Sequence, residues 1–96
     1  MDLQVTGEIW FWKGPAPHHF VTVADRECGA LEAVAPAVSY GWGMIPVSAA
    51  IGSTLWTTSL FPKDGGYIVP LKAKVRSVEG LDVGDIVTIR LTVADR

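Results

Sequence analysis

Residues 59–93 constrain the fold most strongly, because apolar and polar residues alternate there between tight turns. In the last part of this stretch, apolar residues fall at positions 87, 89, 91 and 93, and polar residues fall at 88, 90 and 92. A period of two is typical of a strand with one buried face. The preceding "PKDGG" is rich in residues that accept positive φ, so it predicts a turn before the strand "YIVPL". The pattern indicates strands connected with almost no intervening loop.

The first half of the chain adds further strands. Residues 3–12 alternate, and "KGPAP" then breaks the pattern before a short strand in "HHFVTV". The segments "MIPVSAAI" and "TLWTTSL" flank Gly52-Ser53, which predicts a hairpin turn. We expect one face of residues 3–12 to point inward and the other outward. The inward set is Leu3, Val5, Ile9 and Phe11, and the outward set is Gln4, Thr6, Glu8, Trp10 and Trp12.

Two short helices are predicted between the strands. Asp25 is a plausible N-cap, Cys28, Leu31 and Val34 recur at helical spacing, and Pro36 is expected to end this helix.

The second helix is predicted where Leu71, Val75 and Val78 share one face. Gly80 is its expected C-terminal stop. Gly84-Asp85 is then expected to turn the chain into the last strand, with Gly84 at positive φ.

Length and charge restrict the class of protein. Ninety-six residues predict a single domain over positions 1–96, and a net charge of −2 makes broad attraction to nucleic acid or an anionic membrane unexpected. No apolar run approaches the length needed to cross a bilayer, and the N-terminus does not read as a signal peptide. With one cysteine, the chain is expected to be cytoplasmic. The elements predict a mainly β fold with two short helices, in which six strands close a small barrel.

The candidate ligand-binding residues are Trp10, Trp12, His18 and Trp42. Both strand indoles fall on the polar face of their strand, and a short connection is expected to bring His18 close to Trp12. Such rings would suit a small planar or anionic ligand. The alternative is that the indoles are covered and belong to the core.

Lys72 and Arg76 are the candidate contacts for an anion or a protein partner, since they neighbour each other on the second helix. A solvated helix face is the alternative. No catalytic, metal or cofactor site is expected. Adjacent His18 and His19 point to opposite strand faces, Cys28 suits an inert core position, and no nucleophile–base–orienter set can be assembled.

Several motifs carry a resemblance over the whole chain. They are "WFWxG" at 10–14, "FVTV" at 20–23, "IPV" at 45–47, "TSLFPKDGGY" at 58–67, "KVR" at 74–76 and "GLDVGDIVTI" at 80–89. In order and spacing, the chain resembles the bacterial and archaeal Domain of Unknown Function 1905 family. The resemblance implies a small closed β-barrel with Greek-key character and no established activity.

Two functional hypotheses follow. The first is a non-catalytic binding or accessory module for a small ligand or a protein partner. The second is a nucleic-acid-binding barrel, because "GLDVGDIVTI" resembles the turn of swapped-hairpin transcription regulators. The acidic balance of the chain argues against the second hypothesis.

Overall fold

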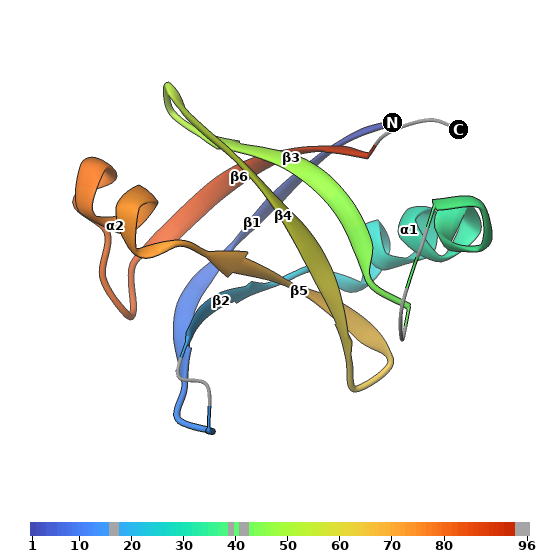
Figure 1. Cartoon of the computed structure of the whole chain (residues 1–96), viewed down its shortest axis with the longest axis horizontal. Coiled ribbons are helices and arrows are strands. Elements are labelled where there is room, and N and C mark those ends of the chain that lie inside the picture. The colour runs from blue at the N-terminus through green and yellow to red at the C-terminus, as the bar shows by residue number, and fades with distance from the viewer. Residues whose placement is uncertain (16–17, 39, 41–42, 94–96) are drawn as a thin grey trace.

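Six antiparallel strands close into a barrel in the order β1-β2-β5-β4-β3-β6, with β6 pairing back onto β1. The structure is a computed structural model that describes residues 1–15, 18–38, 40 and 43–93. The strands are β1 (Asp2–Trp12), β2 (His18–Thr22), β3 (Ile45–Ile51), β4 (Thr54–Lys63), β5 (Gly66–Leu71) and β6 (Ile86–Val93). The helices are α1 (Asp25–Val38) and α2 (Ala73–Glu79), on opposite sides of the barrel in Figure 1.

The connection of the strands is of the Greek-key type. Strands β3, β4 and β5 are sequential antiparallel neighbours, and β6 returns to lie beside β3. The predicted fold class, a closed six-stranded barrel with two helices, is confirmed.

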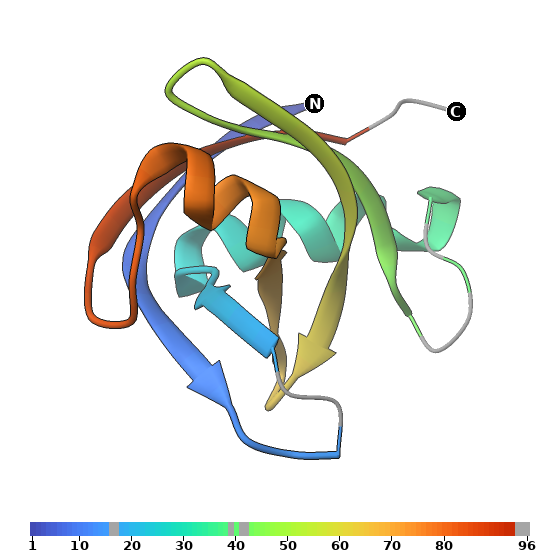
Figure 2. The same cartoon turned by 60° about the vertical axis from the view of Figure 1, so that its left-hand side comes forward.

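Strands β1 and β4 join the two sheets of the barrel, because each pairs with one neighbour along its first part and with another along its last part. Residues 2–8 of β1 pair with β6 and residues 9–12 pair with β2, as can be followed in Figure 2. In the same way, residues 54–60 of β4 pair with β3 and residues 61–63 pair with β5. A Cβ atom on Gly7 would lie 3.1 Å from Val21 Cγ1 and 3.4 Å from the Thr22 carbonyl oxygen. Glycine therefore lets β2 approach closely near the position where β1 changes partner.

The core is apolar and is built mainly from the inward faces of the strands. On β6 the inward residues Val87, Ile89, Leu91 and Val93 are buried, while Thr88, Arg90 and Thr92 are exposed, as predicted. The helices complete the core with Cys28 and Leu31 from α1 and Val75 from α2. Among the described residues, no helix has both the length and the apolar character that a membrane span requires.

The structure corrects three details of the sequence prediction. Phe11 is 38% exposed instead of buried, although it alternates with the outward Trp10 and Trp12 near the end of β1. Helix α1 begins at Asp25, with the Ala24 carbonyl accepting from the Cys28 amide, so Asp25 lies inside the helix and is not its N-cap. The helix also continues to Val38, because Pro36 removes only one amide donor close to the helix end.

A further correction concerns α2, because Val78 is exposed and Leu71 belongs to β5. Gly80 adopts φ 65°, and the amide of Leu81 donates to the Arg76 carbonyl across 2.8 Å. This left-handed cap folds the chain back, so that Leu81, instead of Val78, packs against the core.

Turn residues have the backbone angles that their chemistry allows. Gly52 has φ 58°, and Asp64 and Gly65 have φ 52° and 80°, which suits tight antiparallel hairpins.

The tip of the β3–β4 hairpin is held from two sides. Arg90 Nη2 donates to the Gly52 carbonyl across 2.6 Å, and Thr54 Oγ1 donates to Glu79 Oε2 of α2.

We predict that Leu91→Ala lowers the free energy of unfolding by about 2–5 kcal/mol, because Leu91 is fully buried and its removal leaves a cavity. Urea denaturation measures this change. A loss below about 1 kcal/mol would mean that the site collapses around the smaller residue.

Gly84 provides a test of backbone strain without steric contact. Its φ is 93°, as predicted, and a Cβ placed there meets no atom within 4 Å. We expect Gly84→Val to destabilise the protein by about 1–3 kcal/mol through backbone strain alone. Gly29→Ala is the matched control, since Gly29 also has open space but lies in a helix. That variant should be neutral or stabilising by up to about 1 kcal/mol, and equal losses in both variants would contradict the account.

Candidate functional site

An aromatic cluster covers part of the outer surface of the barrel, where the core does not require apolar side chains. Trp10 lies opposite Phe20 and Trp12 lies opposite His18 in the β1–β2 register. Phe20 is at the centre, with ring centroids 5.2 Å from Trp10, 5.2 Å from His18 and 6.0 Å from Phe61. We call this set the aromatic face: Trp10, Trp12, His18, Phe20 and Phe61. Its position follows from the alternation of β1, which sends both indoles outward.

Part of the aromatic face is structural. Phe20 is only 7% exposed although it points away from the barrel interior, because its neighbours enclose it. Trp10 is half-buried, and its Nε1 donates to Thr22 Oγ1 across 3.0 Å. These two rings therefore form a small second core on the outside of the barrel. For Trp10, this supports the alternative that the indole is covered and serves packing.

The remaining rings are open to solvent. Trp12 is 43% exposed and Phe61 is 39% exposed. The Nζ atom of Lys63 lies 5.4 Å from the Trp12 ring centroid, within the range of a cation–π contact, and also pairs with Asp64 at 3.4 Å. The accessible part of the aromatic face thus combines two rings with a nearby cation.

The ionisation of His18 on this face is influenced by Arg76 of α2. Burial lowers the pKa of His18 below its usual value, and the positive charge of Arg76 lowers it further. The neighbouring His19 is on the other side of the strand, with its ring 4.9 Å from that of Phe11. Burial likewise lowers the pKa of His19, with a further contribution from Arg76. Neutral imidazoles are therefore favoured at both positions.

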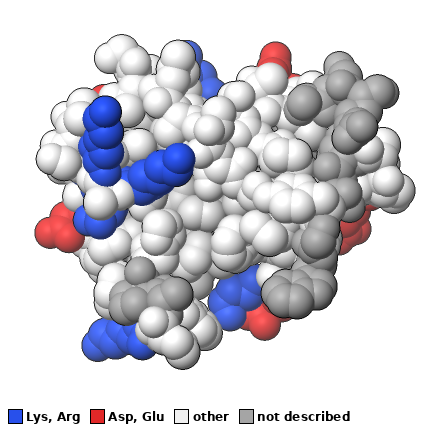
Figure 3. All heavy atoms as spheres, viewed as in Figure 1, with Lys and Arg blue, Asp and Glu red and all other residues white. Residues whose placement is uncertain are grey.

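The basic residues of α2 lie beside the aromatic face and not within it. Lys72 is exposed and precedes the helix, while Arg76 is half-buried. Arg76 Nε is buried and, within the described part of the chain, has no hydrogen-bond partner. Figure 3 shows basic side chains gathered over α2 and a broad surface without charge over β4 and β5. The structure thus brings Trp10, Trp12 and His18 together, whereas Trp42 lies outside the described residues.

No group of three or more His, Cys, Asp or Glu side chains is positioned to hold a metal ion among the described residues. Cys28 is buried, and its Sγ contacts the Val23 carbonyl oxygen at 3.6 Å.

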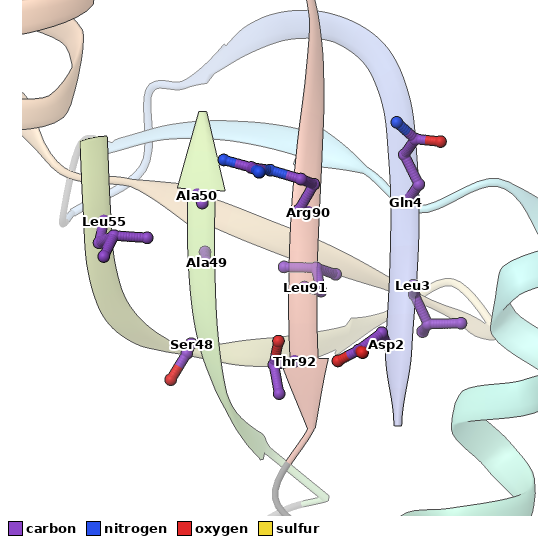
Figure 4. Close-up of a pocket in the computed structure, with 10 residues that line it drawn as sticks. All are labelled: Asp2, Leu3, Gln4, Ser48, Ala49, Ala50, Leu55, Arg90, Leu91 and Thr92. Atoms are coloured by element: carbon purple, nitrogen blue, oxygen red, sulfur yellow. The ribbon is translucent and has the colours of Figure 1, made fainter. Parts of the chain in front are cut away.

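A second surface feature was not anticipated from the sequence. The outer faces of β1, β6, β3 and β4 form a hollow of about 550 Å³. Figure 4 shows the side chains that line it, with Arg90 extending from β6 toward Ala50 on β3. The lining is Asp2, Leu3, Gln4, Ser48, Ala49, Ala50, Leu55, Arg90, Leu91 and Thr92. The small residues that line it come from β3 and β6, and only the sheet register reveals that these two strands are neighbours.

Together, these features define a class of protein: a small closed antiparallel barrel, flanked by two helices, with an exposed aromatic face. The profile of the family described as Domain of unknown function (DUF1905) matches residues 6–91, and the chain belongs to this family. A search of the curated proteins found no match.

The His18 environment gives a pH prediction. Since the folded protein holds the pKa of His18 below the unfolded value of about 6.5, the unfolded state takes up a proton first as the pH falls. The stability contributed by neutral His18 should therefore be present above about pH 6.5 and lost as the pH falls through the folded pKa.

Arg76→Gln should raise the pKa of His18 toward its usual value, because one of the two causes of the lowering is removed. An NMR titration of the His18 ring measures this change. Lys74→Gln is the control, since Lys74 is on the same helix and is not among the causes of the shift. An unchanged His18 pKa in Arg76→Gln would contradict the assignment.

Proposed function

We propose that this protein is a non-catalytic binding module whose aromatic face takes a small planar ligand, with anionic groups favoured. The single observation that carries the proposal is the exposure of Trp12 and Phe61 beside the Lys63 ammonium, on the outside of a barrel with a complete apolar core. Indole and phenyl rings offer flat contact area with little loss of conformational freedom. Lys63 is positioned to attract the negative end of a bound ring.

Within this site the rings have different roles. Phe20 and Trp10 hold the surface in shape, because they are packed and Trp10 is hydrogen-bonded to Thr22. Trp12 supplies the stacking surface. His18 lies opposite Trp12 and is uncharged near neutral pH, so it offers a ring nitrogen without excess positive charge.

The alternative of nucleic-acid binding has weaker support. Stacking rings and cations are also what single-stranded nucleic acids need, but they need a groove with several cations along the backbone. The net charge is −2, which disfavours a long anionic backbone. Filter binding of a single-stranded oligonucleotide at two salt concentrations tests this alternative.

The proposed function is tested by titrating the protein with indole and with benzoate while NMR follows the indole N–H signals. We expect saturable shifts at Trp12, with a Kd on the order of 1 mM or tighter and tighter binding of benzoate. Trp12→Ala removes this reporter, so the Trp10 indole N–H signal is followed in that variant. We expect it not to shift, with little loss of stability, because Trp12 is exposed.

Leu55→Ala is the matched control, since Leu55 is an exposed apolar side chain outside the aromatic face. It should leave the titration unchanged. The proposal is wrong if neither probe gives a saturable shift, if Leu55→Ala removes the shift, or if Trp12→Ala unfolds the protein.

A further inference from the structure

The hollow over β1, β6, β3 and β4 is separate from the aromatic face and shares no residue with it. The outer face of a closed barrel is normally convex, but here small side chains lie side by side along neighbouring strands. Ser48 is paired with Thr92, and Ala50 is paired with Arg90. Longer side chains at Gln4 and Leu55 stand around these small residues and make the depression (Figure 4).

Arg90 is held in place over the hollow. Its Nη2 donates to the Gly52 carbonyl, which draws the side chain across Ala50. Ala50 is consequently only 6% exposed although it faces outward. A guanidinium has five N–H donors in a fixed fork, so the single bond to Gly52 leaves several donors for a ligand. Because the side chain is already extended, binding a carboxylate costs less conformational entropy.

A negative charge lies at the other end of the hollow. Asp2 pairs with Thr92 and Gln4 pairs with Arg90, so Asp2 and Arg90 are diagonal neighbours on adjacent strands. Such positions are separated by roughly 7–8 Å. Within the described chain, neither Asp2 nor Arg90 is joined to an oppositely charged side chain. Asp2 lies in the same cross-strand row as Thr92 and Ser48, whereas Arg90 lies in the next row. The two opposite charges therefore stand apart.

We propose that this hollow binds a short zwitterionic molecule of dipeptide size. Its carboxylate binds the free donors of Arg90, and its ammonium group binds Asp2. The Ser48 and Thr92 hydroxyls lie in the same cross-strand row as Asp2, where they face the ammonium end of the ligand. Leu55, which is 77% exposed, offers an apolar wall for a small side chain. A volume of about 550 Å³ is within the range of small-molecule sites.

The test uses three probes: alanyl-alanine, which has both charges, N-acetylalanine, which has only the carboxylate, and alaninamide, which has only the ammonium. Amide shifts of β1, β3 and β6 are followed by NMR. We expect saturable binding of alanyl-alanine with a Kd on the order of 1 mM or tighter. Each single-charge probe should bind at least about tenfold more weakly.

Variants separate the two ends of the site. Arg90→Gln should weaken alanyl-alanine and N-acetylalanine by about tenfold or more. Asp2→Asn should weaken alanyl-alanine but leave N-acetylalanine unchanged. Because Arg90 also anchors the hairpin, Arg90→Lys is included to keep the positive charge, and its shift map reports whether the fold is retained. Arg90→Lys should weaken binding less than Arg90→Gln does, since only the fork of donors is lost.

Trp12→Ala is the control for the aromatic face and should not change any of these affinities. The proposal is overturned if alanyl-alanine gives no saturable shift on β1, β3 and β6, or if it binds no better than N-acetylalanine. It is also overturned if Arg90→Gln keeps the native shift map and binds as the unmodified protein does.

Discussion

The barrel depends on the exchange of partners along β1 and β4. Each of these strands leaves one neighbour and takes another along its length, and this exchange joins two partial sheets into a closed barrel. Gly7 and Val21 come into close contact near one exchange, so a side chain at position 7 would push β2 away. The order of strands, the enclosed core and the positions of both outer surfaces all follow from this closure.

The two outer surfaces show how one strand can serve different purposes along its length. Where β1 pairs with β6, its outward residues are polar, and small neighbours leave a hollow beside Arg90. Where β1 pairs with β2, its outward residues are indoles, and Phe20 packs against Trp10. The change in surface chemistry coincides with the change in pairing partner.

Much of the fold could be predicted from the sequence, because alternation and turn chemistry are local signals. The inward face of β6, the hairpin at Gly52 and the positive φ of Gly84 are of this kind. The exposure of Val78 could not be predicted, since it depends on Leu81 folding back after Gly80. The pairing of Trp12 with His18 followed from a short connection, whereas the hollow required the register of four strands. Long-range register has no local sequence signal.

The buried thiol of Cys28 has a consequence for measuring motion. It is the only sulfhydryl in the chain, it lies on α1, and its Sγ would be 3.4 Å from a Cβ placed on Gly66 of β5. A thiol-specific reagent can react only after α1 separates from β5. When closing is faster than labelling, the reaction rate reports the equilibrium population of that opened form. Comparing this opening free energy with that of global unfolding shows whether α1 detaches alone or only when the whole barrel opens.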